Sequence, residues 1–193
     1  GLTYVELAAG EHHTVSRRSD GSVIAWGDNS SSQCNIPSKP PGSSYVQIAA
    51  GWEHYAARCS DGSLVTWGRN YLGQCDVPNL PPGLTYVQVA AGFQHTVARR
   101  SDGSIVAWGN NFAGQCNVPV LPPGLTYVGI AATYNHTVAQ VSDGSLVAWG
   151  DCGSGLCNVP SPPAGLSYPQ ASAGGLHSTG LLSDGSVVAW GEN

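Results

Sequence analysis

Histidines at a fixed spacing are the first candidates for chemistry in this sequence. Five of them lie 41 residues apart: His13, His54, His95, His136 and His177. One interpretation is a ring of metal ligands or general bases. The alternative is a structural imidazole that hydrogen-bonds a neighbouring backbone group where a strand begins. We favour the structural role, because a metal site would need histidines from separate copies to converge within a few ångströms. His12 occurs only in the first copy, where we expect it to be exposed.

The cysteines divide into a periodic set and two others. Cys34, Cys75, Cys116 and Cys157 recur at the same period. Equivalent positions on neighbouring copies are too far apart for a disulfide, so we expect small buried residues beneath a connection. Cys152 stands where other copies have asparagine (Asn29, Asn70, Asn111). A Cys152–Cys157 disulfide is predicted and would suit an oxidising compartment, the alternative being two reduced thiols. Cys59 stands alone, and the spacing matches no zinc motif.

Most acidic residues are explained by local structure. Five of the twelve carboxylates precede a glycine in the same Ser-Asp-Gly-Ser turn: Asp20, Asp61, Asp102, Asp143 and Asp184. No nucleophile–base pair, phosphate-binding loop or additional carboxylate dyad is recognisable. The sequence therefore predicts no catalysis, no cofactor and no metal site.

A single repeat of 41 residues positions all of these side chains. The copies are residues 1–41, 42–82, 83–123, 124–164 and 165–193, the last being shorter, and together they predict one domain over residues 1–193. A period of this length indicates a repeat architecture in which neighbouring copies bury each other's faces.

One copy is predicted to form three or four short strands. In the third copy they are Tyr86–Gly92, His95–Arg100 and Ser104–Gly109, with an Asp-Gly hairpin between the last two and Asn-Val-Pro as a candidate fourth strand. No segment has helical periodicity. We therefore expect an all-β chain, a β-propeller of five repeats whose tryptophans pack between blades. A closed five-bladed ring is expected, and an arc is the alternative. Pro169 indicates that the first strand of each blade is an edge strand.

Three motifs with fixed spacing recur along the chain: AAG-x-x-H, SDGS followed by two apolar residues and AWG, and WG-x-N-x-x-GQ-x-x-VP. In these motifs the chain resembles the regulator-of-chromosome-condensation repeat family, in the short-repeat form that includes beta-lactamase inhibitor proteins. The resemblance implies a β-propeller that binds partners through its loops and has no catalysis of its own. The number of copies departs from the family, which typically closes with about seven blades.

Composition excludes some partners. The net charge is -5 and Lys39 is the only lysine, whereas nucleic-acid binders carry a basic surface, so we expect no nucleic acid partner. No apolar run approaches the length of a membrane span, so no membrane insertion is expected. The chain begins at Gly1 and contains two glycosylation acceptor patterns, at Asn29 and Asn135, which are compatible with an extracellular or secreted protein.

Positions that vary between copies are the candidates for binding. They fall in the loop after the first strand and in the start of the connection after the third, and alternating strand direction puts both at one end of a blade. The candidates are Glu11, His12, Trp52, Glu53, Phe93, Gln94, Tyr134, Asn135, Tyr71 and Phe112. Five are aromatic, a residue class that dominates interface hot spots. We predict a loop face that binds a protein. The alternatives are a multivalent lectin with one glycan site per blade or groove, a structural spacer, and local packing of each loop.

Overall fold

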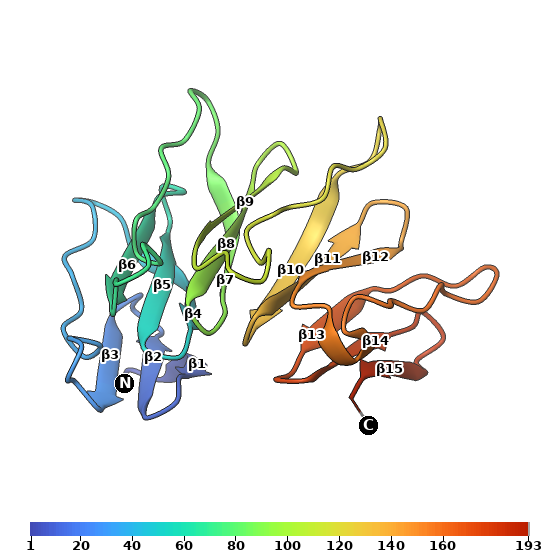
Figure 1. Cartoon of the computed structure of the whole chain (residues 1–193). Helices are drawn as coiled ribbons and strands as arrows, with labels where there is room; N and C mark the ends of the chain where they lie inside the picture. Colours follow the sequence, from blue (N-terminus) through green and yellow to red (C-terminus); the bar gives the residue numbers. More distant parts are fainter. Residues whose placement is uncertain (193) are drawn as a thin grey trace.

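The computed structural model describes residues 1–192 and contains five three-stranded antiparallel sheets. Each sheet is one sequence copy, and its strands lie in chain order from the inside of the fan to the outside (Figure 1). The strands are β1 (Tyr4–Ala9), β2 (His13–Arg18), β3 (Val23–Gly27), β4 (Tyr45–Ala50), β5 (His54–Cys59), β6 (Leu64–Gly68), β7 (Tyr86–Ala91), β8 (His95–Arg100), β9 (Ile105–Gly109), β10 (Tyr127–Thr133), β11 (His136–Val141), β12 (Leu146–Gly150), β13 (Gln170–Ala173), β14 (His177–Leu181) and β15 (Val187–Gly191). One short 3-10 turn, η1 (Gly153–Gly155), lies in the fourth connection. The predicted propeller fold is confirmed.

The Asp-Gly hairpins form as expected. In blade 3, Gly103 has a φ of +81°, a conformation that a residue with a Cβ adopts only with strain. The backbone N–H of Ser104 donates to the Asp102 carboxylate over 2.9 Å, and the other four hairpins repeat this bond. The periodic carboxylates therefore stabilise turns.

Each sheet has three strands, the smaller of the two numbers predicted from sequence. The Asn-Val-Pro segments do not pair with the third strand, so each blade has three strands rather than four. The first strand of each blade lies at the inner edge of its sheet, as Pro169 indicated. In blade 5 that strand, β13, begins only at Gln170, directly after this proline, which lacks the N–H needed for pairing.

The hydrophobic core lies between neighbouring blades. Val97 of blade 3, for example, packs with Tyr127, Ile130 and Trp149 of blade 4, and the same kind of cluster recurs at the other three junctions. A three-stranded sheet has two faces, and each is covered only when blades stack. Burial of apolar surface therefore depends on the contact between copies rather than on any copy alone.

In blades 2 to 5, a tryptophan joins the blade to the connection that precedes it. The indole N–H of Trp108 donates to the backbone carbonyl of Gln74 over 3.0 Å, and three other tryptophans make the equivalent bond: Trp67, Trp149 and Trp190. All four are at least nine-tenths buried, as predicted. Trp26 of blade 1 is 47% exposed, because no connection among the described residues packs over its outer side as it does in the other blades.

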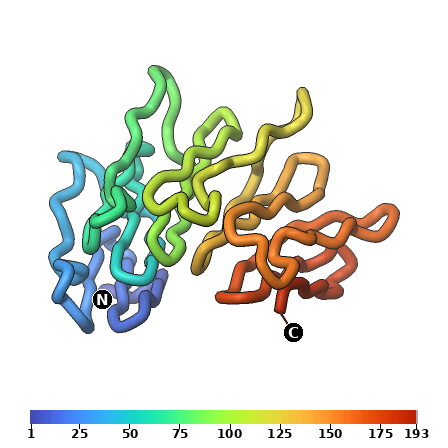
Figure 2. The backbone as a smooth tube through the Cα atoms, in the orientation of Figure 1, coloured from blue at the N-terminus to red at the C-terminus, as the bar shows by residue number. Residues whose placement is uncertain are grey.

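The blades are arranged as an open arc rather than the closed ring that was expected (Figures 1 and 2). The backbone traces of blades 1 and 5 lie at opposite ends of the fan, and both chain ends are on its lower side in this view. The outer blade faces agree with this arrangement, since Leu7 of β1 is 67% exposed and Val187 of β15 is 65% exposed. Of the two alternatives, the structure has the arc.

Candidate functional site

Three of the five periodic histidines, His54, His95 and His136, link consecutive blades by side-chain hydrogen bonds, whereas His13 packs edge-to-face on Tyr55 of the next blade. The Nε2 atom of His54 lies 2.9 Å from the Thr96 hydroxyl, and His95 and His136 contact the hydroxyls of Thr137 and Ser178 in the same way. The Thr96 hydroxyl donates its only proton to the Gln74 carbonyl, so it must accept a proton from His54 Nε2. A structural role was predicted, but the predicted partner was wrong. The partner is a side chain of the next blade rather than a nearby backbone group.

Burial keeps the imidazole rings of His54, His95 and His136 neutral near pH 7. Burial lowers the pKa of His54 to about 3 and the pKa of His95 to about 4, and burial also lowers the pKa of His136. The Nδ1 atoms of these three rings are buried without a partner. Neutral imidazoles held in separate junctions are poorly placed for shared chemistry. Within residues 1–192, no group of three or more histidine, cysteine, aspartate or glutamate side chains is arranged to hold a metal.

The buried histidines predict a specific loss of stability in mild acid. Their folded pKa lies below the usual 6.5, so the unfolded chain binds protons first as pH falls. The contribution of these neutral histidines to the free energy of unfolding is therefore fully present above about pH 6.5, and it is lost as the pH falls toward about 4. We expect the unfolding free energy to drop between pH 7 and pH 5 by up to about 2 kcal/mol per buried histidine. Urea titrations of the wild type and of His95→Asn at both pH values test this. An equal drop in both proteins would contradict it.

In four of the five copies, a glycine leaves room for the histidine ring. At Gly92, a Cβ atom would overlap the ring of His95, and the equivalent glycines of copies 1, 2 and 5 are restricted in the same way. Copy 4 has Thr133 instead, and there β10 continues by one residue to pair Thr133 with His136. The loop that follows therefore begins one residue later in blade 4.

The predicted disulfide between Cys152 and Cys157 is present, with Cα atoms 5.0 Å apart. Cys34, Cys75 and Cys116 form no disulfide and are half-buried rather than fully buried, and Cys59 is buried. Burial raises the pKa of the Cys75 thiol to about 12 and that of Cys116 to about 11, so both thiols stay protonated at neutral pH.

Three aromatic side chains from successive blades meet at one place, and we call them the central cluster: Trp52, Phe93 and Tyr134. The ring centroids of Trp52 and Phe93 are 3.8 Å apart in an edge-to-face arrangement. Those of Phe93 and Tyr134 are 4.9 Å apart, and those of Trp52 and Tyr134 are 6.0 Å apart. Each ring occupies the first variable position of its loop. Because the inner strands converge, these equivalent positions come into contact.

The loops are also joined through their backbones. The N–H of Glu11 donates to the carbonyl of Trp52 over 3.2 Å, and the N–H of Phe93 donates to that of Tyr134 over 2.7 Å. A hollow opens beside the cluster. Its walls are Glu11 and the three rings, and the small Ala-Gly ends of the inner strands form much of the remaining surface. Four of the ten predicted binding residues thus line one site.

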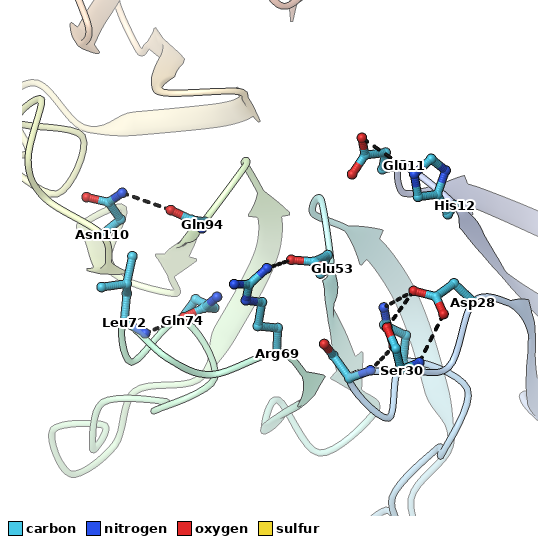
Figure 3. Close-up of polar contacts among 12 residues, drawn as sticks. Glu11, His12, Asp28, Ser30, Glu53, Arg69, Leu72, Gln74, Gln94 and Asn110 are labelled. Carbon is cyan, nitrogen blue, oxygen red and sulfur yellow. Dashed lines mark hydrogen bonds and ion pairs between the residues drawn. The ribbon is translucent and has the colours of Figure 1, made fainter.

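In blades 2 and 3, the side chain at the second variable position of the loop is paired with the residue that follows Trp-Gly (Figure 3). The Glu53 carboxylate forms an ion pair with Arg69, and the Asn110 amide donates to Gln94 over 3.1 Å. Sequence analysis did not single out Arg69 or Asn110. Their types change together with the loop residue, glutamate with arginine and glutamine with asparagine, and that pattern was visible in the repeats.

The remaining predicted residues lie away from the hollow. Tyr71 and Phe112 are at the start of the connections that follow β6 and β9, 79% and 89% exposed, and Arg69 stacks over the Tyr71 ring at 4.7 Å. His12 is exposed as expected and lies 3.6 Å from the Glu11 carboxylate. Asn135 accepts a long hydrogen bond of 3.5 Å from the Gln115 amide of the preceding connection, so its side chain serves a junction between blades.

Comparisons with known proteins identify the class of repeat. The model of the Regulator of chromosome condensation (RCC1) repeat matches residues 4–33, 45–74, 86–115 and 170–193. These segments make up more than half of the chain, which belongs to this repeat family. The model does not match copy 4, where Gly129, Thr133 and Cys152 depart from the other copies. A search of curated proteins found no match.

Solved structures share the fold. The chain is similar to Prp20p from Saccharomyces cerevisiae, a protein described with its binding properties to Gsp1p and histones, with a TM-score of 0.81 at 23% identity over 99% of this chain and 58% of that one. Human WBSCR16 has a TM-score of 0.84 at 19% identity over 98% and 62% of the two chains. The ectodomain of the receptor kinase CR4 from Physcomitrella patens has a TM-score of 0.74 at 21% identity, over 100% and 51%. The chain thus spans less than two thirds of each of these structures.

Proposed function

We propose that this chain is a non-catalytic binding module that presents its loop face to a protein partner. The observation that carries the proposal is the contact among the rings of Trp52, Phe93 and Tyr134, which come from three blades. A lectin with one glycan site per blade needs an aromatic platform in each blade, and rings packed on one another make a single shared surface instead. Large rigid side chains of this kind dominate protein interfaces.

The loop face combines this centre with two exposed aromatic side chains. Phe112 and Tyr71 stand at its periphery, and the paired polar residues Glu53–Arg69 and Gln94–Asn110 lie next to the centre. An aromatic centre with polar neighbours is the usual composition of a protein interface. The wider family supports the same class of function, since the yeast relative is described as binding proteins.

We also propose an extracellular or secreted location. A disulfide is present at Cys152–Cys157, and one similar structure is a receptor ectodomain. Described residues 1–192 contain no helix with the length and apolar character of a membrane span.

The binding proposal predicts which substitutions matter. Partners captured on the immobilised chain would be identified by mass spectrometry, and each affinity measured by calorimetry. We expect Trp52→Ala and Phe112→Ala to weaken protein binding about tenfold or more, since hot-spot truncations cost about 1–2 kcal/mol or more. The matched control is Val120→Ala. Val120 is 97% exposed, and its neighbour Leu121 lies against the Asp102–Gly103 hairpin at the other end of the blade.

A glycan array run with the same variants gives the contrasting result. Sugar binding at several equivalent sites, weakened by Trp52→Ala, would establish the lectin alternative instead. Protein binding that survives both aromatic substitutions would overturn the loop face as the binding surface.

A further inference from the structure

We propose that the hollow beside the central cluster binds a cationic side chain of the protein partner, a lysine, a methylated lysine or an arginine. The inference rests on the proposed function and adds the chemical class of the group that is recognised. Four features carry it: the aromatic walls, the charge of Glu11, the absence of a competing cation among the lining residues, and the small residues of the inner wall.

The aromatic walls favour a cation. The face of an aromatic ring carries partial negative charge, and a cation within about 6 Å of a ring centroid is attracted to it. Trp52 and Tyr134 have ring centroids 6.0 Å apart and tilted by 43°, and Tyr134 is 41% exposed. All three rings line the hollow, so a group seated in it contacts more than one aromatic side chain. Neutral apolar side chains gain from the same burial but not from the ring charge.

The carboxylate of Glu11 adds a negative charge at the wall of the hollow. Glu11 occupies the loop position that is aromatic in the next three copies, and its backbone N–H bonds the carbonyl of Trp52, so it lies next to the aromatic rings at the wall of the hollow. Glu53, the other acidic residue of these loops, is neutralised by Arg69. Within residues 1–192, the Glu11 carboxylate has a single charged neighbour, the exposed His12, at 3.6 Å.

No lysine or arginine lines the hollow among the described residues. The chain as a whole has 7 basic and 12 acidic residues, so the surrounding charge also favours a cation. An incoming ammonium or guanidinium group would pair with Glu11 without displacing a cation of this chain. A carboxylate or phosphate group would meet repulsion from Glu11.

The small residues keep the hollow open. Gly51 and Gly92 lie in its inner wall, and at both positions a Cβ atom would overlap the adjacent histidine ring. These histidines join consecutive blades, so a larger residue at Gly51 or Gly92 would disturb a blade junction unless the inner strand is lengthened, as β10 is at Thr133. The space beside the aromatic rings is thus a consequence of how the blades are joined.

The test is an NMR titration of the intact chain, followed through the indole N–H signal of Trp52, which the Trp52→Phe variant assigns. The probes are the Nα-acetyl amides of trimethyl-lysine and arginine, and the carbon isostere of trimethyl-lysine, in which the quaternary nitrogen is replaced by carbon. We expect saturable binding of the cations with millimolar affinity, and binding of the isostere weakened about threefold to thirtyfold, the range of cation–π energies. Glu11→Gln should weaken cation binding about threefold to tenfold, whereas His12→Ala should preserve it.

Two results would overturn the inference: isostere binding as tight as that of the cation, or no cation-dependent shift at tens of millimolar probe. These results would not by themselves overturn the proposed function. If the isostere binds as well as the cation while Trp52→Ala and Phe112→Ala still abolish protein binding, the loop face binds proteins through a neutral anchor. If those two variants bind protein normally, the proposed function fails regardless of how the probes behave.

Discussion

Trp108→Ala is expected to lower the free energy of unfolding by about 3–5 kcal/mol, the usual cost of truncating a buried aromatic residue. Trp108 is 8% exposed and fills the junction between blades 2 and 3, where its indole N–H donates to Gln74. The Gln74 carbonyl keeps a second donor, the Thr96 hydroxyl, so the loss reflects mainly the cavity and the lost apolar contact.

The repeat itself provides the control. Trp26 has the same sequence position in blade 1 but is 47% exposed, and no residue among 1–192 accepts a hydrogen bond from its indole N–H. Trp26→Ala should therefore cost about 1 kcal/mol or less, in the range of substitutions at exposed positions. Urea denaturation of both variants, followed by circular dichroism, makes the comparison. Equal losses would show that the outer face of blade 1 is covered in solution, contrary to the open arc.

Loss of the Cys152–Cys157 disulfide is expected to destabilise the fourth connection by about 2 kcal/mol, the loop-entropy value for a ring this small. The effect should extend to blade 5, since the carbonyl of Leu156, inside that ring, accepts the indole N–H of Trp190. Dithiothreitol, or the double substitution of both cysteines by serine, should lower the unfolding midpoint of the wild type.

The other copies show what the disulfide replaces. In copy 3 the Asn111 side chain accepts the backbone N–H of Cys116 over 2.9 Å and donates to Asn117 over 3.0 Å, and copies 1 and 2 repeat this arrangement. Copy 4 retains the equivalent of Asn117, namely Asn158. The disulfide thus joins the same two positions that asparagine joins elsewhere by hydrogen bonds.

Because the two arrangements are equivalent, asparagine at position 152 is expected to restore the stability that is lost with the disulfide. Cys152→Asn should recover most of the stability that the serine double variant loses, and its unfolding midpoint should not respond to dithiothreitol. Cys152→Ala, which offers neither bond, is the matched control and should remain destabilised. If Cys152→Asn is no more stable than Cys152→Ala, the asparagine and the disulfide do not perform the same structural task.

The parts of the fold predicted from sequence are those that every blade repeats. The strand His95–Arg100 and the Asp102–Gly103 turn depend on residues close together in the chain, and both lie where periodicity placed them. The Cys152–Cys157 pair was also visible, because a departure at one position of an otherwise regular repeat points to its nearest compatible partner.

The contacts between blades could not be predicted in the same way. The hydroxyl that pairs with His54 belongs to Thr96, 42 residues later, and nothing local identifies it. The open arc could not be predicted from the sequence either. Ring closure depends on the angle between packed sheets, and a small change of this angle at each junction accumulates along the chain. The exposure of Trp26 follows from the arc and was therefore not expected.

The sequence by itself determined the blade: its strands, its turns, its periodic histidine and tryptophan, and the loop positions that vary. It could do so because each copy meets the same local requirements and repeats the same residues. Only the tertiary structure decided that Trp52, Phe93 and Tyr134 contact one another beside Glu11, whereas Tyr71 and Phe112 stand apart. The physical reason is radial geometry: the loops after the inner strands of successive blades converge, whereas the segments that follow the outer strands diverge.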